Sequence, residues 1–142
     1  MDAYALIAAL RDEPARGEVE GLLRDLERPA RVAAINLAEV IDQLVRVSGW
    51  DASGVQDRLD LLELGGLVAL ATDRRLAVLG GHVRASFYNR KTCQVSLADC
   101  VAVATAQDAA DSLATSDPDL AAVARQLGVV IIPLPDSEGR RP

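Results

Sequence analysis

Residues 96–119 read SLADCVAVATAQDAADSLATSDPD, and the expected fold is built around this stretch. Ser96 is a favoured N-cap residue, and Asp99 follows three residues later, where a capping-box acid lies. Ala, Val and Leu dominate residues 97–110, a composition typical of a helix buried on nearly all sides. Residues 113–115 then read as a short inner strand, and Asp117 caps a helix with proline at its first position.

Helical and strand patterns alternate along the rest of the chain. Helical patterns cover residues 3–10, 17–26, 36–47, 53–64 and 120–127, with one more from Thr72 toward Tyr88, and short apolar runs occur at 32–34, 67–70 and 129–132. Asn36 and Thr72 are expected to cap the helices that begin beside them. The alternation predicts an α/β fold with a parallel sheet.

Length and composition indicate one cytoplasmic domain. The 142 residues are enough for a single core, and residues 134–142 form a polar tail that we expect to be loose. No signal peptide or membrane span is evident, and Cys93 and Cys100 form no CxxC pair. The net charge of -6 disfavours broad electrostatic binding of nucleic acid. It still allows a nucleic-acid enzyme that contacts its substrate through a bound cation.

Four acids share one local setting, at or near the start of an expected helix: Asp2, Glu39, Asp99 and Asp117. Helix capping alone could account for each of them, at about 0.3–1 kcal/mol. Glu39 and Asp99, however, have apolar neighbours and no basic residue close in sequence, and buried carboxylates need a partner. A hard cation such as Mg²⁺, or Mn²⁺, would supply the counter-charge and could activate a water against a phosphodiester.

The other polar candidates are ambiguous. Asp119 is either an accessory acid or an ordinary first-turn acid, and Ser116 either orients a ligand or belongs to a turn. Asp42 is expected to be solvated, and His82 lacks the neighbouring acid that a general base would favour.

Four segments of the chain together resemble the motifs of the PIN-domain family, and most closely those of VapC-like toxin ribonucleases of type II toxin–antitoxin modules. In order along the chain they are Asp2-Ala3-Tyr4-Ala5-Leu6, Asn36-Leu37-Ala38-Glu39-Val40, Ser96-Leu97-Ala98-Asp99-Cys100 and Thr115-Ser116-Asp117-Pro118-Asp119-Leu120. The likeness spans Asp2 to Pro133. It implies a three-layer α/β/α fold with a short parallel sheet, metal-dependent RNA cleavage, inhibition by a cognate antitoxin, and homodimers.

The same resemblance implies roles for individual residues. Asp2, Glu39, Asp99 and Asp117 correspond to the acidic metal-site residues, and Asp119 to an accessory acid. We expect Asp99 and Asp2 to bind the metal directly, and Glu39 and Asp117 to hold waters or a second ion. The nearest basic residues for the RNA backbone are Arg84, Arg90 and Lys91.

One departure from the family pattern concerns the start of the chain. Family members usually have a short apolar strand before the first Asp, whereas only Met1 precedes Asp2 here. We therefore expect the natural product to begin earlier, with an apolar strand that ends at Asp2.

Two other functions compete with a metal-dependent ribonuclease. A PIN-like module with weak activity could mainly bind an antitoxin-like partner. A phosphatase-like or receiver-like acidic pocket is disfavoured, because the only lysine, Lys91, precedes Asp99 instead of following a later strand.

Overall fold

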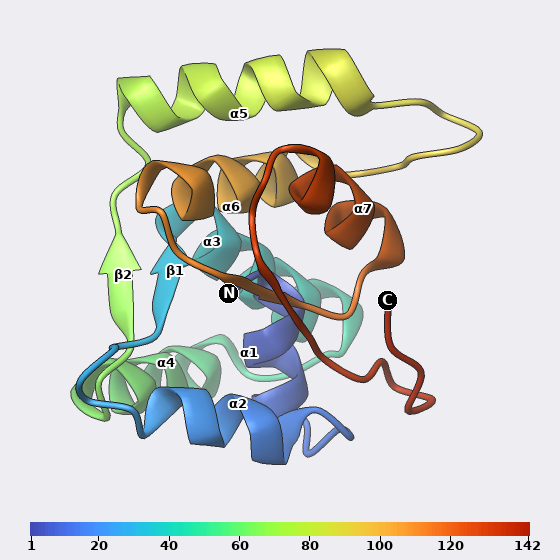
Figure 1. The fold of residues 1–142 in the computed structure, drawn as a ribbon. Helices are drawn as coiled ribbons and strands as arrows, with labels where there is room; N and C mark the ends of the chain where they lie inside the picture. The colour runs from blue at the N-terminus through green and yellow to red at the C-terminus, as the bar shows by residue number, and fades with distance from the viewer.

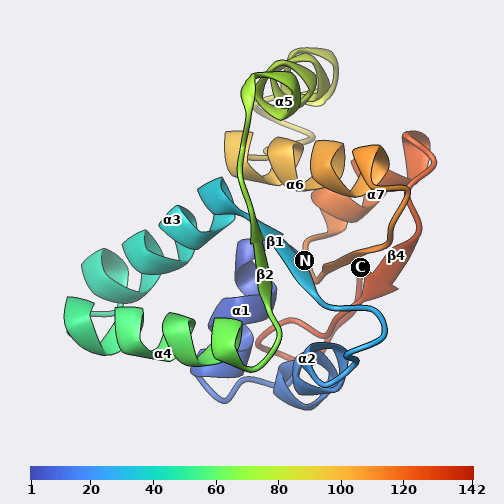
Figure 2. The same ribbon diagram turned by 90° about the vertical axis from the view of Figure 1, so that its left-hand side faces the viewer.

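The computed structural model describes all residues, 1–142, as helices in two layers around short parallel strands (Figures 1 and 2). The elements are α1 (Ala3–Leu10), α2 (Arg16–Leu23), β1 (Arg31–Ala33), α3 (Ala34–Asp42), the π-helical turn η1 (Gln43–Val47), α4 (Ala52–Leu64), β2 (Val68–Leu70), α5 (Arg74–Phe87), α6 (Leu97–Asp108), β3 (Leu113–Thr115), α7 (Pro118–Gln126) and β4 (Ile131–Pro133). In Figure 1 α5, α6 and α7 lie in the upper part of the molecule, and α1, α2 and α4 lie in the lower part. The expected three-layer α/β/α architecture is confirmed.

Two hydrophobic cores lie on the two sides of the strands. The lower core is formed by α1 to α4 with β1 and includes the fully buried Leu6, Val40 and Leu44. The upper core is formed by α5 to α7 with β3, and the fully buried Val103 and Leu120 belong to it. Aliphatic side chains dominate both, as the few aromatic residues require.

Most helix starts agree with the sequence signals, with two exceptions. Ser96 and Asp99 form the expected capping box of α6, and Asp117 caps α7. The expected cap at Thr72 is wrong, because Asp73 accepts from the backbone N–H of Leu76 and begins α5. The expected cap at Asn36 is also wrong. Strand β1 runs directly into α3 at Ala34, so Asn36 lies inside the helix.

The parallel sheet is divided into two pairs. Strand β1 pairs in parallel with β2, and strand β3 pairs in parallel with β4, as two separate two-stranded sheets. Between the pairs, the Met1 ammonium donates to the carbonyl of Arg31 at 2.6 Å, and the N–H of Asp2 donates to the carbonyl of Ala114 at 3.2 Å. Consecutive residues that bond alternately to a strand on either side have the hydrogen-bonding pattern of a central parallel strand.

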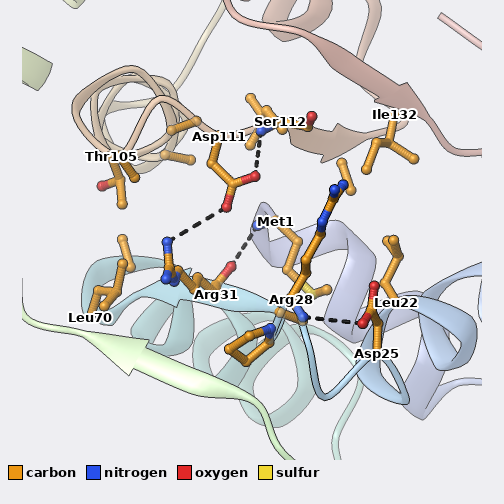
Figure 3. Close-up of a pocket in the computed structure, with 18 residues that line it drawn as sticks. Met1, Leu22, Asp25, Arg28, Arg31, Leu70, Thr105, Asp111, Ser112 and Ile132 are labelled. Atoms are coloured by element: carbon orange, nitrogen blue, oxygen red, sulfur yellow. Dashed lines mark hydrogen bonds and ion pairs between the residues drawn. The ribbon is translucent and has the colours of Figure 1, made fainter.

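A pocket of about 210 Å³, lined by both apolar and charged residues, continues from Met1 between the two strand pairs (Figure 3). Its lining includes Met1, Ala30 and Arg31 on one side and Ser112 and Leu113 on the other. The facing strand edges therefore have room for backbone and side chains upstream of Met1.

We expect an extended apolar segment joined to Met1 to fill this pocket as a strand. Burying two side chains there would contribute about 3–6 kcal/mol, which corresponds to a rise in Tm of roughly 6 °C or more. Such a segment would also replace an ammonium group whose pKa is lowered by burial. The measurement compares Tm after adding about four Val and Ile residues or an equally long Gly-Ser segment. Equal Tm values for these two extensions would contradict the prediction.

The end of the chain returns to the lower layer. Leu134 is fully buried and donates its N–H to the carbonyl of Thr115 at 2.9 Å. Arg141 pairs with Glu18 of α2 at 2.7 Å. Looseness of residues 134–142 stays a prediction. None of the helices combines the length and hydrophobicity that a membrane span needs.

Candidate active site

All four acids singled out by the sequence line one pocket of about 440 Å³, which we call the acidic pocket. Its lining residues are Asp2, Ala3, Tyr4, Ile7, Arg11, Glu13, Glu39, Gln43, Val47, Ser48, Asp99, Asp117 and Ser137. The acids come from the starts of α1, α6 and α7 and from the middle of α3. The fold thus brings together carboxylates that lie up to 115 residues apart in sequence, Asp2 and Asp117 being the extremes.

Asp2, Asp99 and Asp117 also cap helices, and this capping is compatible with a second role in binding a cation. Oδ1 of Asp2 accepts from the N–H of Ala5 at 2.9 Å, and Oδ2 of Asp99 accepts from the N–H of Ser96 at 2.7 Å. Asp117 uses Oδ1 for two backbone N–H groups of α7. Each cap therefore occupies one carboxylate oxygen. The other oxygens of Asp99 and Asp117 make no hydrogen bond within the chain.

Glu39 is the one acid of the four that does not cap a helix. Its Oε2 is buried and has no hydrogen-bond partner. One turn earlier, Asn36 is fully buried, and neither Nδ2 nor Oδ1 is partnered. Buried polar atoms without partners are uncommon and costly. Of these two residues, Glu39 lines the acidic pocket, and Asn36 lies behind it on the same helix.

Burial and mutual repulsion make the acids harder to ionise. Burial, opposed by the Thr115 hydroxyl and the Ala5 N–H, raises the pKa of Asp2 to about 6. Burial and then the charges of Asp99 and Asp2 raise the pKa of Glu39 to about 7. Burial is also the main reason why the pKa of Asp99 is raised. A site that resists losing its protons is one that a cation would stabilise.

The donor set fits a hard divalent cation. The four side chains supply carboxylate oxygens, the ligands that Mg²⁺ and Mn²⁺ prefer. None of them forms a salt bridge with a basic side chain. As the side chains are placed, no three acidic, His or Cys groups converge closely enough to hold an ion together. The structure thus contains the donors without a formed ligand cage.

Several expected site residues do not line the acidic pocket: Asp119, Ser116, Arg84, Arg90 and Lys91. Asp119 accepts from the N–H of Gln94 at 2.9 Å. The guanidinium of Arg84 donates to the carbonyl of Val95 at 2.8 Å and lies 4.2 Å from the ring centre of Tyr88. Asp42 is exposed and paired with Arg46, as expected for a solvated acid.

The rest of the pocket wall carries no signal in the sequence. Arg11 and Glu13 lie just beyond the end of α1, Gln43 and Val47 belong to the π-helical turn, and Ser137 is part of the tail. These residues share no motif or spacing, because packing of α1 against α3 and the returning tail places them together. A π-helical turn beside a pocket is a common feature of functional sites.

Comparisons with known proteins agree on the fold. The family model described as PIN domain matches residues 1–126. Among solved structures, VapBC2 from Rickettsia felis bound to a DNA fragment from their promoter is similar, with a TM-score of 0.60 and 16% sequence identity. The match covers 89% of this chain and 90% of that chain, and at this identity it supports the fold alone. No curated protein sequence matches this chain.

Proposed function

This chain belongs to the PIN-domain family, and from that premise we propose that it is a metal-dependent endoribonuclease, the toxin of a type II toxin–antitoxin module. One observation carries the proposal. Four carboxylates from separate elements line a single pocket, and none of them forms a salt bridge with a basic side chain. Such a set favours a divalent cation bound with the phosphates of a substrate. Mg²⁺ is the proposed ion, and Mn²⁺ would suit the same oxygens.

Asp99 and Asp2 are proposed to bind the cation directly, with Glu39 and Asp117 holding waters or a second ion. When bound, the cation polarises the phosphodiester and lowers the pKa of water. Asp99 and Asp117 present an oxygen that their caps leave free. The carboxylate of Glu39, which lines the pocket and has a pKa raised to about 7, is suited to accept the proton that water loses when its oxygen bonds to phosphorus. The bond from phosphorus to the leaving sugar oxygen breaks in the same displacement.

The direct test is RNA cleavage by the purified chain, with Mg²⁺ or with EDTA. We expect internal cuts in single-stranded RNA that require the divalent ion and stop on chelation. Intact RNA in Mg²⁺ and in Mn²⁺, together with formation of a complex with a partner protein, would favour the alternative of a weakly active binding module. If the chain neither cleaves RNA nor forms such a complex, the proposed function is wrong.

A cognate antitoxin is the proposed partner, and it would contact α3 and α4. Most of their apolar stripes belong to the lower core, with Val40, Leu44 and Val55 fully buried. On α4, however, Leu61 and Leu64 remain 65% and 85% exposed. Val47 is also exposed and lines the acidic pocket. An apolar helix on this surface could direct an arginine into the carboxylates. A homodimer is also proposed, on the family resemblance.

Co-expression with the neighbouring reading frame should give a stable complex that does not cut RNA. Replacing Leu61 and Leu64 with Ser should weaken that complex while RNA cleavage persists, because both side chains are exposed and their loss leaves the core intact. Val130→Ser is the matched control, since Val130 is similarly exposed beside β4 in the upper half. A neighbour that neither binds nor inhibits would contradict this partner.

A further inference from the structure

Arg11 is the only basic residue among those that line the acidic pocket. It is the C-cap residue of α1, and Asp2 caps the other end of the same helix. The nine-residue separation corresponds to ~13 Å along the helix axis. Both residues nevertheless line the same pocket.

The guanidinium of Arg11 is only partly engaged. Its contact with a carboxylate joins Nε to Oε1 of Glu13 at 3.3 Å, and its side chain is 46% exposed. Arg16, which has the same exposure, instead contacts two acids, Asp12 at 3.0 Å and Glu20 at 2.6 Å. No carboxylate lies closer than 3.3 Å to Nη1 or Nη2 of Arg11. The planar pair of Nη groups, which suits phosphate oxygens, is therefore available to a ligand.

The alternative cations are less suitable. Arg84 is bound to the Val95 carbonyl and stacked on Tyr88, and it lines a separate hollow with Gly81 and Leu97. Arg90 and Lys91 lie outside the acidic pocket. RNA approaching a chain with a net charge of -6 and four clustered acids meets strong repulsion. A cation on the wall of that pocket is therefore placed to offset it.

We propose that Arg11 binds a backbone phosphate of the RNA, at a nucleotide neighbouring the one whose phosphodiester reacts at the carboxylates. This inference rests on the proposed function. Arg11 thereby fixes the strand along α1, with the reacting phosphate toward the Asp2 end. Glu13 holds the guanidinium through Nε and leaves the Nη groups for the phosphate oxygens.

The test compares Arg11→Ala, Arg11→Lys and Arg16→Ala with the wild-type chain. Arg16→Ala is the matched control, because it removes an equally exposed, ion-paired arginine that does not line the pocket. Binding of a fluorescent single-stranded RNA in EDTA and KM for its cleavage in Mg²⁺ are both measured. Loss of one phosphate contact should reduce the slope of log Kobs against log salt by about 0.7. We expect Arg11→Ala to weaken binding and raise KM about five- to tenfold, with kcat much less affected.

The outcomes separate this inference from the proposed function. Compared with Arg11→Ala, Arg11→Lys should restore most of the salt dependence, because the positive charge remains. It should restore less of the affinity, because the planar guanidinium is lost. The Mg²⁺-induced rise in Tm should be the same for all four chains. If wild type cuts RNA and Arg11→Ala matches Arg16→Ala in KM and salt slope, only the Arg11 inference is overturned. If wild type neither binds nor cuts RNA, the proposed function fails and the inference fails with it.

Discussion

Replacing Asp99 with Asn is expected to lower kcat/KM for RNA cleavage about a thousand-fold, equivalent to ~4 kcal/mol of transition-state stabilisation. The fold should survive, because an Asn oxygen can still accept from the N–H of Ser96 and complete the cap of α6. The change removes one negative charge from the proposed cation site. The Mg²⁺-induced rise in Tm should therefore shrink along with the activity.

Asp42→Asn is the matched control for this experiment. Asp42 lies one turn after Glu39, and it is exposed and paired with Arg46 at 2.6 Å instead of lining the acidic pocket. Its replacement removes the same charge, and cleavage should stay within a fewfold of wild type. An Asp99→Asn chain that cuts RNA at the wild-type rate would show that the metal site has been assigned to the wrong residues.

Local signals in the sequence were sufficient to single out the four acids that line the acidic pocket. Asp99 and Asp117 could be placed because capping chemistry and proline position depend on only a few neighbouring residues. Strand β3 was predicted with its observed bounds, since a short apolar run between two helix signals leaves little choice. Where Asp99 and Asp117 lie relative to their own helices is thus a local property. Glu39 was expected in a first turn and lies instead in the middle of α3.

Asn36 shows where local reasoning failed. An Asn with Glu three residues later has the pattern of a capped helix start. In the structure β1 passes into α3 without a loop, so the helix begins at Ala34 and Asn36 is buried. The backbone preference of Asn was overridden by the need to connect a strand directly to a packed helix. Its unpartnered amide and the nearby Oε2 of Glu39 were accordingly not foreseen.

The division of the sheet and the cationic side of the pocket also lay beyond the sequence. Alternating elements predicted one parallel sheet, but pairing depends on which strands lie next to each other in space. Met1 and Asp2 supply backbone hydrogen bonds to the facing edges of β1 and β3. Arg11 likewise became a candidate only when packing placed the end of α1 beside the acids. In both cases the decisive contact is tertiary.

Without metal, the protein is expected to become less stable as pH rises from about 4 to about 7. Folding raises the pKa of Asp2 from 3.8 to about 6 and that of Glu39 from 4.5 to about 7. Between the unfolded and folded pKa values the native state binds more protons than the unfolded state, so the free energy of unfolding falls as pH increases. For the fully buried Asp2 alone, about two pKa units correspond to about 3 kcal/mol.

The measurement is Tm in EDTA at roughly pH 5.5 and roughly pH 7.5, followed by the same pair of measurements in Mg²⁺. In EDTA we expect a higher Tm at the lower pH, by roughly 5–10 °C. Mg²⁺ should raise Tm mainly at the higher pH, because there the cation replaces protons that the carboxylates have lost. Asp2→Asn should reduce the dependence in EDTA without abolishing it, since Asn keeps the contact with the Ala5 N–H and carries no charge, while Glu39 still titrates with a raised pKa. Asp42→Asn cannot flatten it, because Arg46 lowers the pKa of Asp42 instead of raising it. A Tm in EDTA that is constant or rises with pH over this range would show that folding does not raise the pKa values of Asp2 and Glu39.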